Sequence, residues 1–113
     1  MNSNFSPFAS LSLQRLRIFY TAAKSGRFAK AAEILGITQP AVSLQIRQLE
    51  NHLGGKVFER TGTGIVLTEL GEMAIQYTEQ VLNLIKDLED KSRQFTNIEF
   101  GSVKIGASST PGN

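Results

Sequence analysis

Residues 38–53, TQPAVSLQIRQLENHL, constrain the fold most, because their apolar side chains recur at the spacing of an α-helix. One face of this helix must be buried, and it carries Val42, Ile46, Leu49 and Leu53. The opposite face is unusual for a helix that meets only water, since it carries Pro40, Leu44, Arg47 and Asn51. The outer residues lie within ~40° of the direction opposite the buried face. The sequence therefore predicts a helix with one face in a core and the other against a partner.

Two shorter helices are predicted before this one. The first covers residues 13–24, where Ser12 offers a capping hydroxyl and Gly26 ends the helix. Its apolar stripe consists of Leu13, Leu16, Phe19, Tyr20 and Ala23. The second covers residues 28–35 and has no capping side chain at its start. Its buried face consists of Ala31, Ala32 and Leu35.

The connection between the second and third helices is short. Gly36 can adopt the left-handed conformation of a sharp turn, Thr38 can cap the next helix, and Pro40 is tolerated in a first helical turn. The third helix is then expected over residues 39–53, before two glycines. Two helices joined by a three- or four-residue turn with a glycine form the helix-turn-helix pattern, here at about residues 28–47.

A hairpin is predicted next, in KVFERTGTGIVLT. Residues 57–58 and 65–67 are β-formers on either side of a Gly-Thr-Gly turn. A two-stranded hairpin is marginally stable alone. We therefore expect it to lean on the helices through Phe58 and Leu67.

The last predicted helix begins at Thr68, a capping residue, and runs to about Phe95, a length on the order of 40 Å. Steps of three and four residues define a seam of coiled-coil type, broken only by Lys91. The apolar members of the seam are Leu70, Ala74, Tyr77, Val81, Leu84, Leu88 and Phe95. A three-helix domain cannot cover this length, so the pattern favours dimerisation through the helix. The alternative is a helix that folds back on its own domain.

Composition and charge bound the class of protein. The 113 residues fit one small domain of ordinary size, or a domain plus an appendage. The absence of Cys excludes disulfides and is compatible with a cytoplasmic location. No apolar run approaches the ~20 residues of a membrane span, and residues 1–10 are expected to form a flexible leader. Residues 11–68 carry eight cations and three anions, a net charge of +5, whereas residues 69–113 carry four cations and seven anions. The basic part suggests a polyanionic partner, and a solvated surface that is merely basic is an equal alternative on charge alone.

The chain resembles the N-terminal region of a LysR-type transcriptional regulator over residues 11–95. The resemblance rests on AAEILGITQPAVSLQIRQLE, FER and LTELG, which stand in family order and spacing. Around SLQIRQLE and FERTG the chain is similar to members that control carbon-fixation genes. The resemblance implies a mainly α fold: a winged helix-turn-helix of three helices and a two-stranded wing in residues 11–68, then a dimerising linker helix in residues 69–96. Residues 97–113, including an expected strand at 103–105, then resemble the start of an effector-binding domain, and we infer a longer protein.

The outer face of the third helix is the predicted DNA-reading surface. In the family, the positions of Gln39, Pro40 and Ser43 meet DNA. An amide such as that of Gln39 matches adenine, Leu44 and Pro40 suit thymine methyls, and Arg47 suits a phosphate or a guanine edge. Thr38 completes the predicted set on this helix. The alternatives are a protein contact for Leu44 and a solvated pair with Glu50 for Arg47.

Further cations are candidate phosphate contacts. Arg27 and Lys30 stand at the start of the second helix, where amides and a cation suit a phosphate, although plain surface charge is an equal alternative. Arg60 in the wing is expected to meet a phosphate or the minor groove, and its alternative is a pair with Glu59 or another local acid. Many family members have Arg at the positions of Leu44 and Thr63, so the salt dependence of binding here should be shallower, by about one log-log unit for each lost phosphate contact.

An enzyme is the less favoured class. His52 is the only histidine and has no Ser or Cys nucleophile arranged for it, and a metal site lacks Cys and further His. We expect no cofactor, because an effector would bind the missing C-terminal domain, and Ser108, Ser109 and Thr110 alone should bind nothing. The expected partners are double-stranded DNA and a second copy of the chain, with a tetramer possible for the whole protein. The rival hypothesis is a protein dimerisation module with only non-specific DNA affinity.

Overall fold

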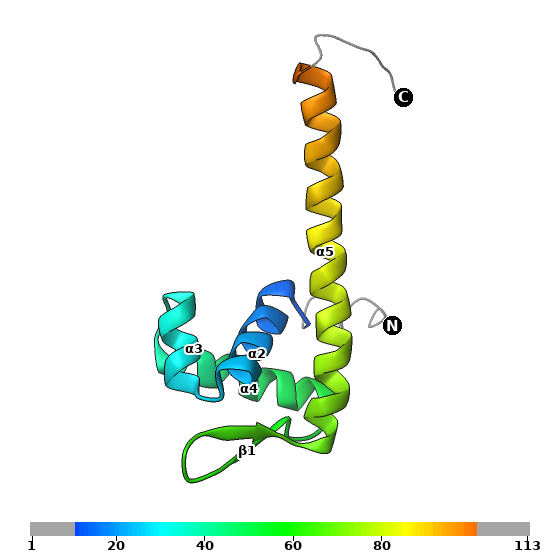
Figure 1. The fold of residues 1–113 in the computed structure, drawn as a ribbon. Coiled ribbons are helices and arrows are strands. Elements are labelled where there is room, and N and C mark those ends of the chain that lie inside the picture. The colour runs from blue at the N-terminus through cyan, green and yellow to red at the C-terminus, as the bar shows by residue number, and fades with distance from the viewer. Residues whose placement is uncertain (1–10, 102–113) are drawn as a thin grey trace. The chain divides into compact units, whose positions relative to one another are not determined.

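The computed structural model describes the backbone of residues 11–101 and the side chains of residues 11–96. The elements follow the order α2 (Leu13–Ser25), α3 (Phe28–Leu35), α4 (Gln39–Leu53), β1 (Phe58–Arg60), β2 (Ile65–Leu67) and α5 (Glu69–Gly101) (Figure 1). The predicted fold class, a mainly α winged helix-turn-helix followed by a long helix, is confirmed. The predicted leader, the strand at 103–105 and the residues at 108–110 lie outside the described residues. The chain divides into two compact units, Met1–Glu79 and Gln80–Asn113.

The helix boundaries follow from the capping residues. The Ser12 hydroxyl accepts from the Arg15 amide at 3.1 Å, and the Thr38 hydroxyl accepts from the Ala41 amide at 3.2 Å. Gly36 has a φ of 70°, so the turn between α3 and α4 uses the left-handed conformation that glycine adopts without strain. As predicted, α3 has no side-chain cap. The helix-turn-helix thus has the limits that its capping residues predict.

The core of the first unit lies where α2, α3, α4 and the hairpin meet. Its least exposed members, on all of these elements or next to them, are Phe19, Ala22, Ala31, Val42, Leu49 and Val57. The stripe predicted for the first helix was partly wrong: Ile18 and Ala22 are buried, whereas Leu13 and Leu16 are only half-buried. Because α2 packs against α3, α4 and β2, its buried arc is wider than one stripe.

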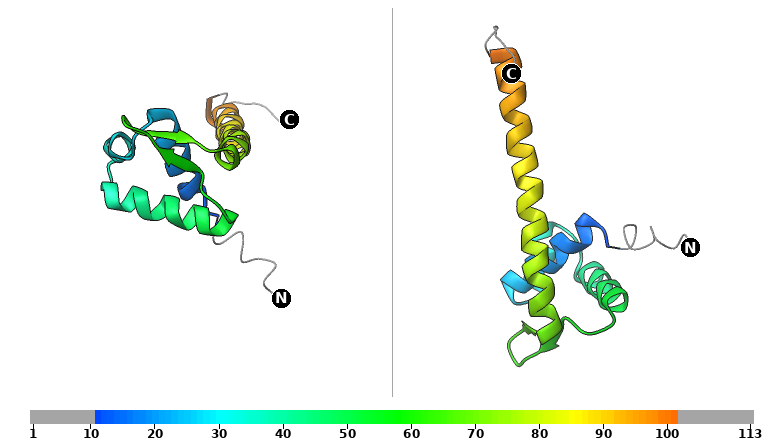
Figure 2. Two further views of the ribbon diagram at one scale, coloured as in Figure 1. Left: turned by 90° about the horizontal axis from the view of Figure 1, so that it is seen from below. Right: turned by 90° about the vertical axis from the view of Figure 1, so that its right-hand side faces the viewer.

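The wing is an antiparallel hairpin in which Phe58 pairs with Leu67 and Arg60 with Ile65. Its inner face packs on the helices, as predicted, since Phe58 is buried and Leu67 packs against the core. The ribbon of β2 lies next to α2 (Figure 2). The Phe58 ring lies 5.5 Å from that of Phe19 and 5.8 Å from that of Phe28, between ring centroids. These aromatic contacts give the short hairpin the support that its own hydrogen bonds lack.

The start of α5 is held by hydrogen bonds and close packing against the segment that precedes β1. The Thr68 hydroxyl accepts from the Gly71 amide at 3.0 Å and donates to the Lys56 carbonyl at 2.6 Å. Gly71 is buried so close to the Val57 carbonyl that a Cβ there would overlap it. Glycine is therefore required in this helical turn for close packing.

The predicted end of the long helix and the predicted seam both need correction. The helix continues to Gly101 instead of ending at 95 or 96, because residues 96–100 contain no glycine or proline to stop it. The seam is not uniform, since Leu70 and Ala74 pack against the core of their own unit. The later seam residues are exposed, at 62 % for Tyr77, 36 % for Val81, 67 % for Leu84, 63 % for Leu88 and 71 % for Phe95.

Candidate nucleic-acid interface

Helix α4 has the two faces that its sequence predicts. Val42, Ile46 and Leu49 are buried beneath it. The outward side chains are exposed, namely Thr38, Gln39, Pro40, Leu44, Arg47 and Asn51, and Ser43 at the edge is half-buried. Leu44 is 45 % exposed, so its side chain is accessible to a partner. The predicted α4 residues therefore share one accessible surface, and their contact with DNA stays a prediction.

Arg47 does not form the local pair considered as its alternative. The Glu50 carboxylate instead accepts a hydrogen bond from the Val57 amide at 2.9 Å, which joins α4 to the segment before β1. Among residues 11–96, Arg47 has neither an ion pair nor a side-chain hydrogen bond. Its guanidinium is therefore available to an anionic partner.

Arg27 and Lys30 lie near the start of α3 but differ in their surroundings. The Arg27 side chain donates to the Thr63 carbonyl at 3.0 Å, so it ties the wing turn to the helix. The neighbouring Gly26 carbonyl accepts from the Ile65 amide at 2.9 Å. Lys30 pairs with Glu33 at 3.5 Å, with both side chains largely exposed. An exposed pair of this kind contributes little, so it leaves Lys30 able to turn to a phosphate.

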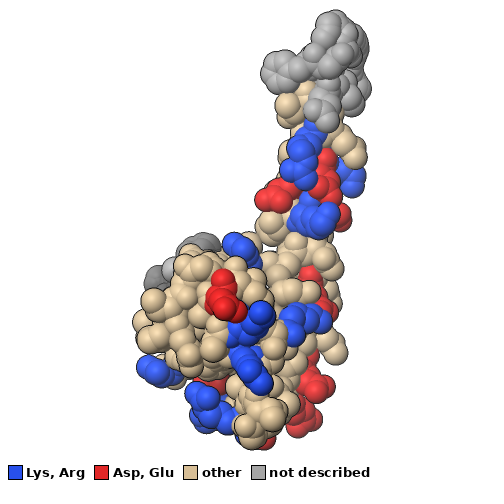
Figure 3. Space-filling model, turned by 60° about the vertical axis from the view of Figure 1, so that its left-hand side comes forward, with Lys and Arg blue, Asp and Glu red and all other residues tan. Residues whose placement is uncertain are grey.

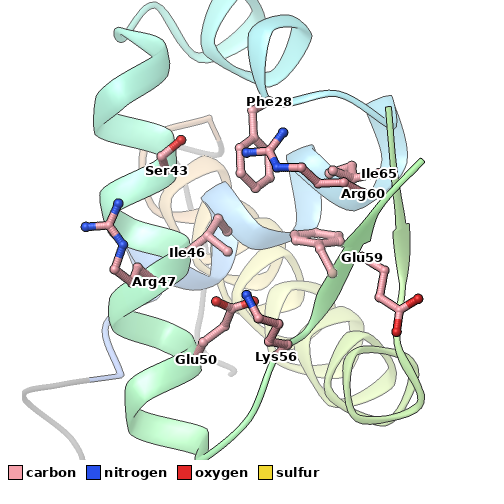
Figure 4. Close-up of a pocket in the computed structure, with 10 residues that line it drawn as sticks. Phe28, Ser43, Ile46, Arg47, Glu50, Lys56, Glu59, Arg60 and Ile65 are labelled. Carbon is pink, nitrogen blue, oxygen red and sulfur yellow. The ribbon is translucent and has the colours of Figure 1, made fainter. Parts of the chain in front are cut away.

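Arg60 projects from β1 over an aromatic ring. Its guanidinium carbon lies 5.6 Å from the centroid of the Phe28 ring, a cation–π distance. Figure 4 shows the side chain of Arg60 across that ring and Glu59 on the other side of the strand. Within the described side chains, the alternative pair between Arg60 and Glu59 does not form.

A surface groove of about 620 Å³ lies between α4 and the wing. It brings together two predicted α4 residues, Ser43 and Arg47, with Arg60 of the wing (Figure 4). Thr38, Gln39, Pro40, Leu44, Arg27 and Lys30 are not among its lining residues. The remaining lining consists of Phe28, Ile46, Glu50, Lys56, Phe58, Glu59 and Ile65.

Two cations near this surface were missed by reasoning from the sequence. Lys56 lines the groove from the segment before β1. Arg15 of α2 donates to the side-chain oxygens of Gln45 at 2.9 Å and Gln48 at 2.6 Å, both on α4. The i, i+3 spacing of the two glutamines was the available signal for one shared partner, but nothing in the spacing identifies that partner as Arg15.

The charge pattern agrees with a polyanion surface on the first unit. On the face shown in Figure 3, Lys and Arg predominate over the helical unit, whereas both signs mix along α5. In α5, the Lys86 side chain donates a hydrogen bond to the Asp90 carboxylate, and this bond lowers the pKa of Asp90 below its ordinary value. The positive charge of Lys86 and the hydrogen bond and charge of Arg93 lower this pKa further.

Among the described residues no cluster of three potential metal ligands occurs, and no helix is long and apolar enough to cross a membrane. His52 is exposed at the end of α4.

Three helices, the short turn between α3 and α4, and the hairpin that follows define a protein of the winged helix-turn-helix class. Residues 13–72 match the model of the bacterial regulatory helix-turn-helix proteins of the lysR family. This chain belongs to that family, which consists of transcriptional regulators and not of enzymes.

Among curated relatives, the chain is 41 % identical over 101 residues to the HTH-type transcriptional regulator CfxR of Cupriavidus necator. It is 44 % identical over 100 residues to a probable RuBisCO transcriptional regulator of Thalassiosira pseudonana. These alignments cover 89 % and 88 % of the chain but only 32 % and 33 % of the relatives, so the chain spans about a third of their length. The predicted similarity to carbon-fixation regulators is confirmed.

Two solved structures are similar in fold. A complex of the CbnR DNA-binding domain with DNA has a TM-score of 0.68 and 32 % identity, covering 75 % of this chain and 98 % of that one. A complex of the BenM DNA-binding domain with catB site 1 DNA has a TM-score of 0.71 and 30 % identity, covering 75 % and 94 %.

Proposed function

We propose that this chain is the DNA-binding region of a transcriptional regulator that reads a promoter site with α4 in the major groove. The observation that carries the proposal is the exposed outer face of α4, with Gln39, Leu44 and Arg47 accessible above a buried inner face. Similarity to two DNA-binding domains in DNA complexes supports it. The names of the relatives support a regulated gene of carbon fixation.

The wing supplies the second contact of this proposal. Arg60 stands on the face of β1 that lines the groove, and Arg27 holds the turn between the strands. Phosphate contacts of this kind position a protein on a duplex, whereas base edges specify the sequence. We assign the positioning role to Arg60, Lys30 and Arg47 and the specifying role to Gln39.

A gel-shift series across point mutants tests the assignment. The site is first obtained by selecting bound fragments from a genomic library. Gln39→Ala should then relax the preference by about 1–3 kcal/mol at one base pair. Arg60→Ala should instead weaken binding to all sequences about equally. If both variants bind every duplex like the parent, the DNA-reading surface has been assigned to the wrong face.

We also propose that two copies of the chain associate through α5, so that the site has imperfect two-fold symmetry. Its support is the exposed run of Tyr77, Val81, Leu84, Leu88 and Phe95, which follow one another at steps of three and four residues except where Lys91 takes the position between the last two. Single exposed apolar residues are ordinary, but a periodic row of this length on one helix is typical of a coiled-coil seam. Leu70 and Ala74 are excluded from this interface, because they pack within their own unit.

Sedimentation at micromolar concentration tests the association. Leu84→Glu with Leu88→Glu should shift the parent dimer to monomer, because both changes place charges in an apolar interface. Glu89→Gln, on the same stretch but outside the seam, is the matched control. A parent chain that sediments as a monomer at high concentration would exclude the dimer while leaving DNA binding by single chains open.

The rival function, a dimerisation module with only non-specific DNA affinity, predicts equal binding to the selected site and to a scrambled duplex. We place the chain in the bacterial cytoplasm, where its DNA target would lie, and we propose that no small-molecule effector binds this part of the protein.

A further inference from the structure

Three cations from three different segments line the groove between α4 and the wing. They are Arg47 on α4, Lys56 on the connecting segment and Arg60 on β1 (Figure 4). In the part of the chain that the structure describes, none of the three forms an ion pair. Such a convergence of unpaired cations has an unfavourable mutual repulsion, which an anion in the groove would relieve.

The two carboxylates of the groove do not neutralise these cations equally. Glu50 already accepts the hydrogen bond from the Val57 amide, which fixes its carboxylate at the base of the connecting segment. Glu59 stands between Phe58 and Arg60 on a strand, so its side chain alternates to the other face. Figure 4 shows its carboxylate beyond β1. Three cations and one engaged carboxylate therefore face the groove.

Lys56 is the one of these three cations that lies outside a helix or strand, but hydrogen bonds hold its backbone in place. Its carbonyl accepts from the Thr68 hydroxyl at 2.6 Å. The next residue, Val57, is buried, donates its amide to Glu50 at 2.9 Å and accepts from the Thr68 amide at 3.0 Å. The backbone at Lys56 is thus held to both α4 and the start of α5, and only the side chain has to be ordered when an anion binds.

We propose that this groove seats one phosphodiester group of the DNA backbone and that Lys56 is a phosphate contact of the domain. The inference rests on the proposed function, because it takes duplex DNA as the source of the phosphate. Helix α4 and the hairpin bound the groove on opposite sides, so a strand that passes between them crosses its mouth. The phosphate then lies between Arg47, Lys56 and Arg60, with the Ser43 hydroxyl as a further donor at the rim.

The test measures DNA affinity against salt concentration by fluorescence anisotropy on the selected duplex. Lys56→Gln should weaken binding roughly tenfold at 0.1 M salt, since one released counterion contributes about 0.9 units of log-log slope. The slope should fall by that amount for each bound chain, while the preference for the site over a scrambled duplex stays unchanged. Lys56→Arg should restore the slope. Lys86→Gln, the same charge change on α5, should leave both quantities at the parent values.

The outcomes separate the inference from the proposed function. A parent with steep salt dependence and a Lys56→Gln variant with the same slope would overturn the phosphate seat alone. A parent without salt-dependent binding would overturn the proposed function and the seat together. A second arm adds inorganic phosphate at constant ionic strength and follows the Lys56 and Val57 amides by NMR. We expect no saturable shift, and saturation at micromolar phosphate would assign the groove to a free anion instead.

Discussion

Replacing Gly71 by alanine should destabilise the domain, although helix propensity alone predicts the reverse. Alanine in a helix is favoured over glycine by about 1 kcal/mol. At Gly71, however, the added Cβ would overlap the Val57 carbonyl oxygen and would lie 2.9 Å from Leu67 Cδ2. A backbone carbonyl cannot rotate away as a side chain can. The carbonyl also accepts the hydrogen bond from the Thr68 amide that starts α5 on the wing.

The expected loss of stability in the Gly71→Ala variant is the sum of three contributions. Overpacking costs about 1–3 kcal/mol, and loss of the hydrogen bond to Val57 costs about 1 kcal/mol. The helix-propensity gain offsets about 1 kcal/mol, so the net loss is about 1–3 kcal/mol.

Urea unfolding followed by circular dichroism, at one fixed protein concentration, measures this loss. Gly62→Ala is the matched control, because a Cβ at Gly62 meets nothing within 4 Å. The stability of this variant should therefore not fall below that of the parent. A Gly71→Ala variant as stable as the parent would refute the argument from close packing.

Three further predictions concern other groups. Glu50→Ala should destabilise the domain by about 1–3 kcal/mol, because the Val57 amide loses its charged acceptor. Thermal melts measure this loss of stability, and Glu59→Ala, which removes an exposed carboxylate, should change the stability little. The Asp90 carboxylate should titrate below its ordinary pKa of 3.8, because Lys86 and Arg93 favour the charged form, so the stabilisation of α5 is present above that value and is lost as pH falls through the lowered pKa. Carboxyl NMR shifts report it, and a midpoint unchanged by Lys86→Ala would contradict it. Calorimetric titration with candidate metabolites should give no heat, and a micromolar signal would place an effector site on this part of the protein.

Local sequence signals predicted most of the fold. Ser12, Thr38 and Gly36 determine where helices begin and end through a single hydroxyl or a single φ angle, and such effects are visible in a short window of sequence. The period of Val42, Ile46 and Leu49 likewise fixes which face of α4 is buried.

Contacts between distant segments were not accessible in this way. The buried arc of α2 depends on which neighbours cover it, so Ile18 and Ala22 were missed. The same limit applies to the seam, since Leu70 has the same spacing as Leu84 but packs within the domain. Glu50 appeared as a possible partner of Arg47, and only the fold shows that it binds an amide seven residues away.

The ties between the wing and the residues before α3 have a consequence for variation in this protein. Gly26 binds the Ile65 amide, Arg27 binds the Thr63 carbonyl, and the Phe28 ring lies beneath Arg60. The turn itself is closed by the Thr61 amide on the Gly64 carbonyl at 2.8 Å. A residue inserted or deleted between the strands would displace Thr63 and Gly64 from their partners Arg27 and Thr61. Outward side chains can therefore be exchanged one at a time without loss of these ties, whereas a change in hairpin length would have to be accompanied by a new set of anchors.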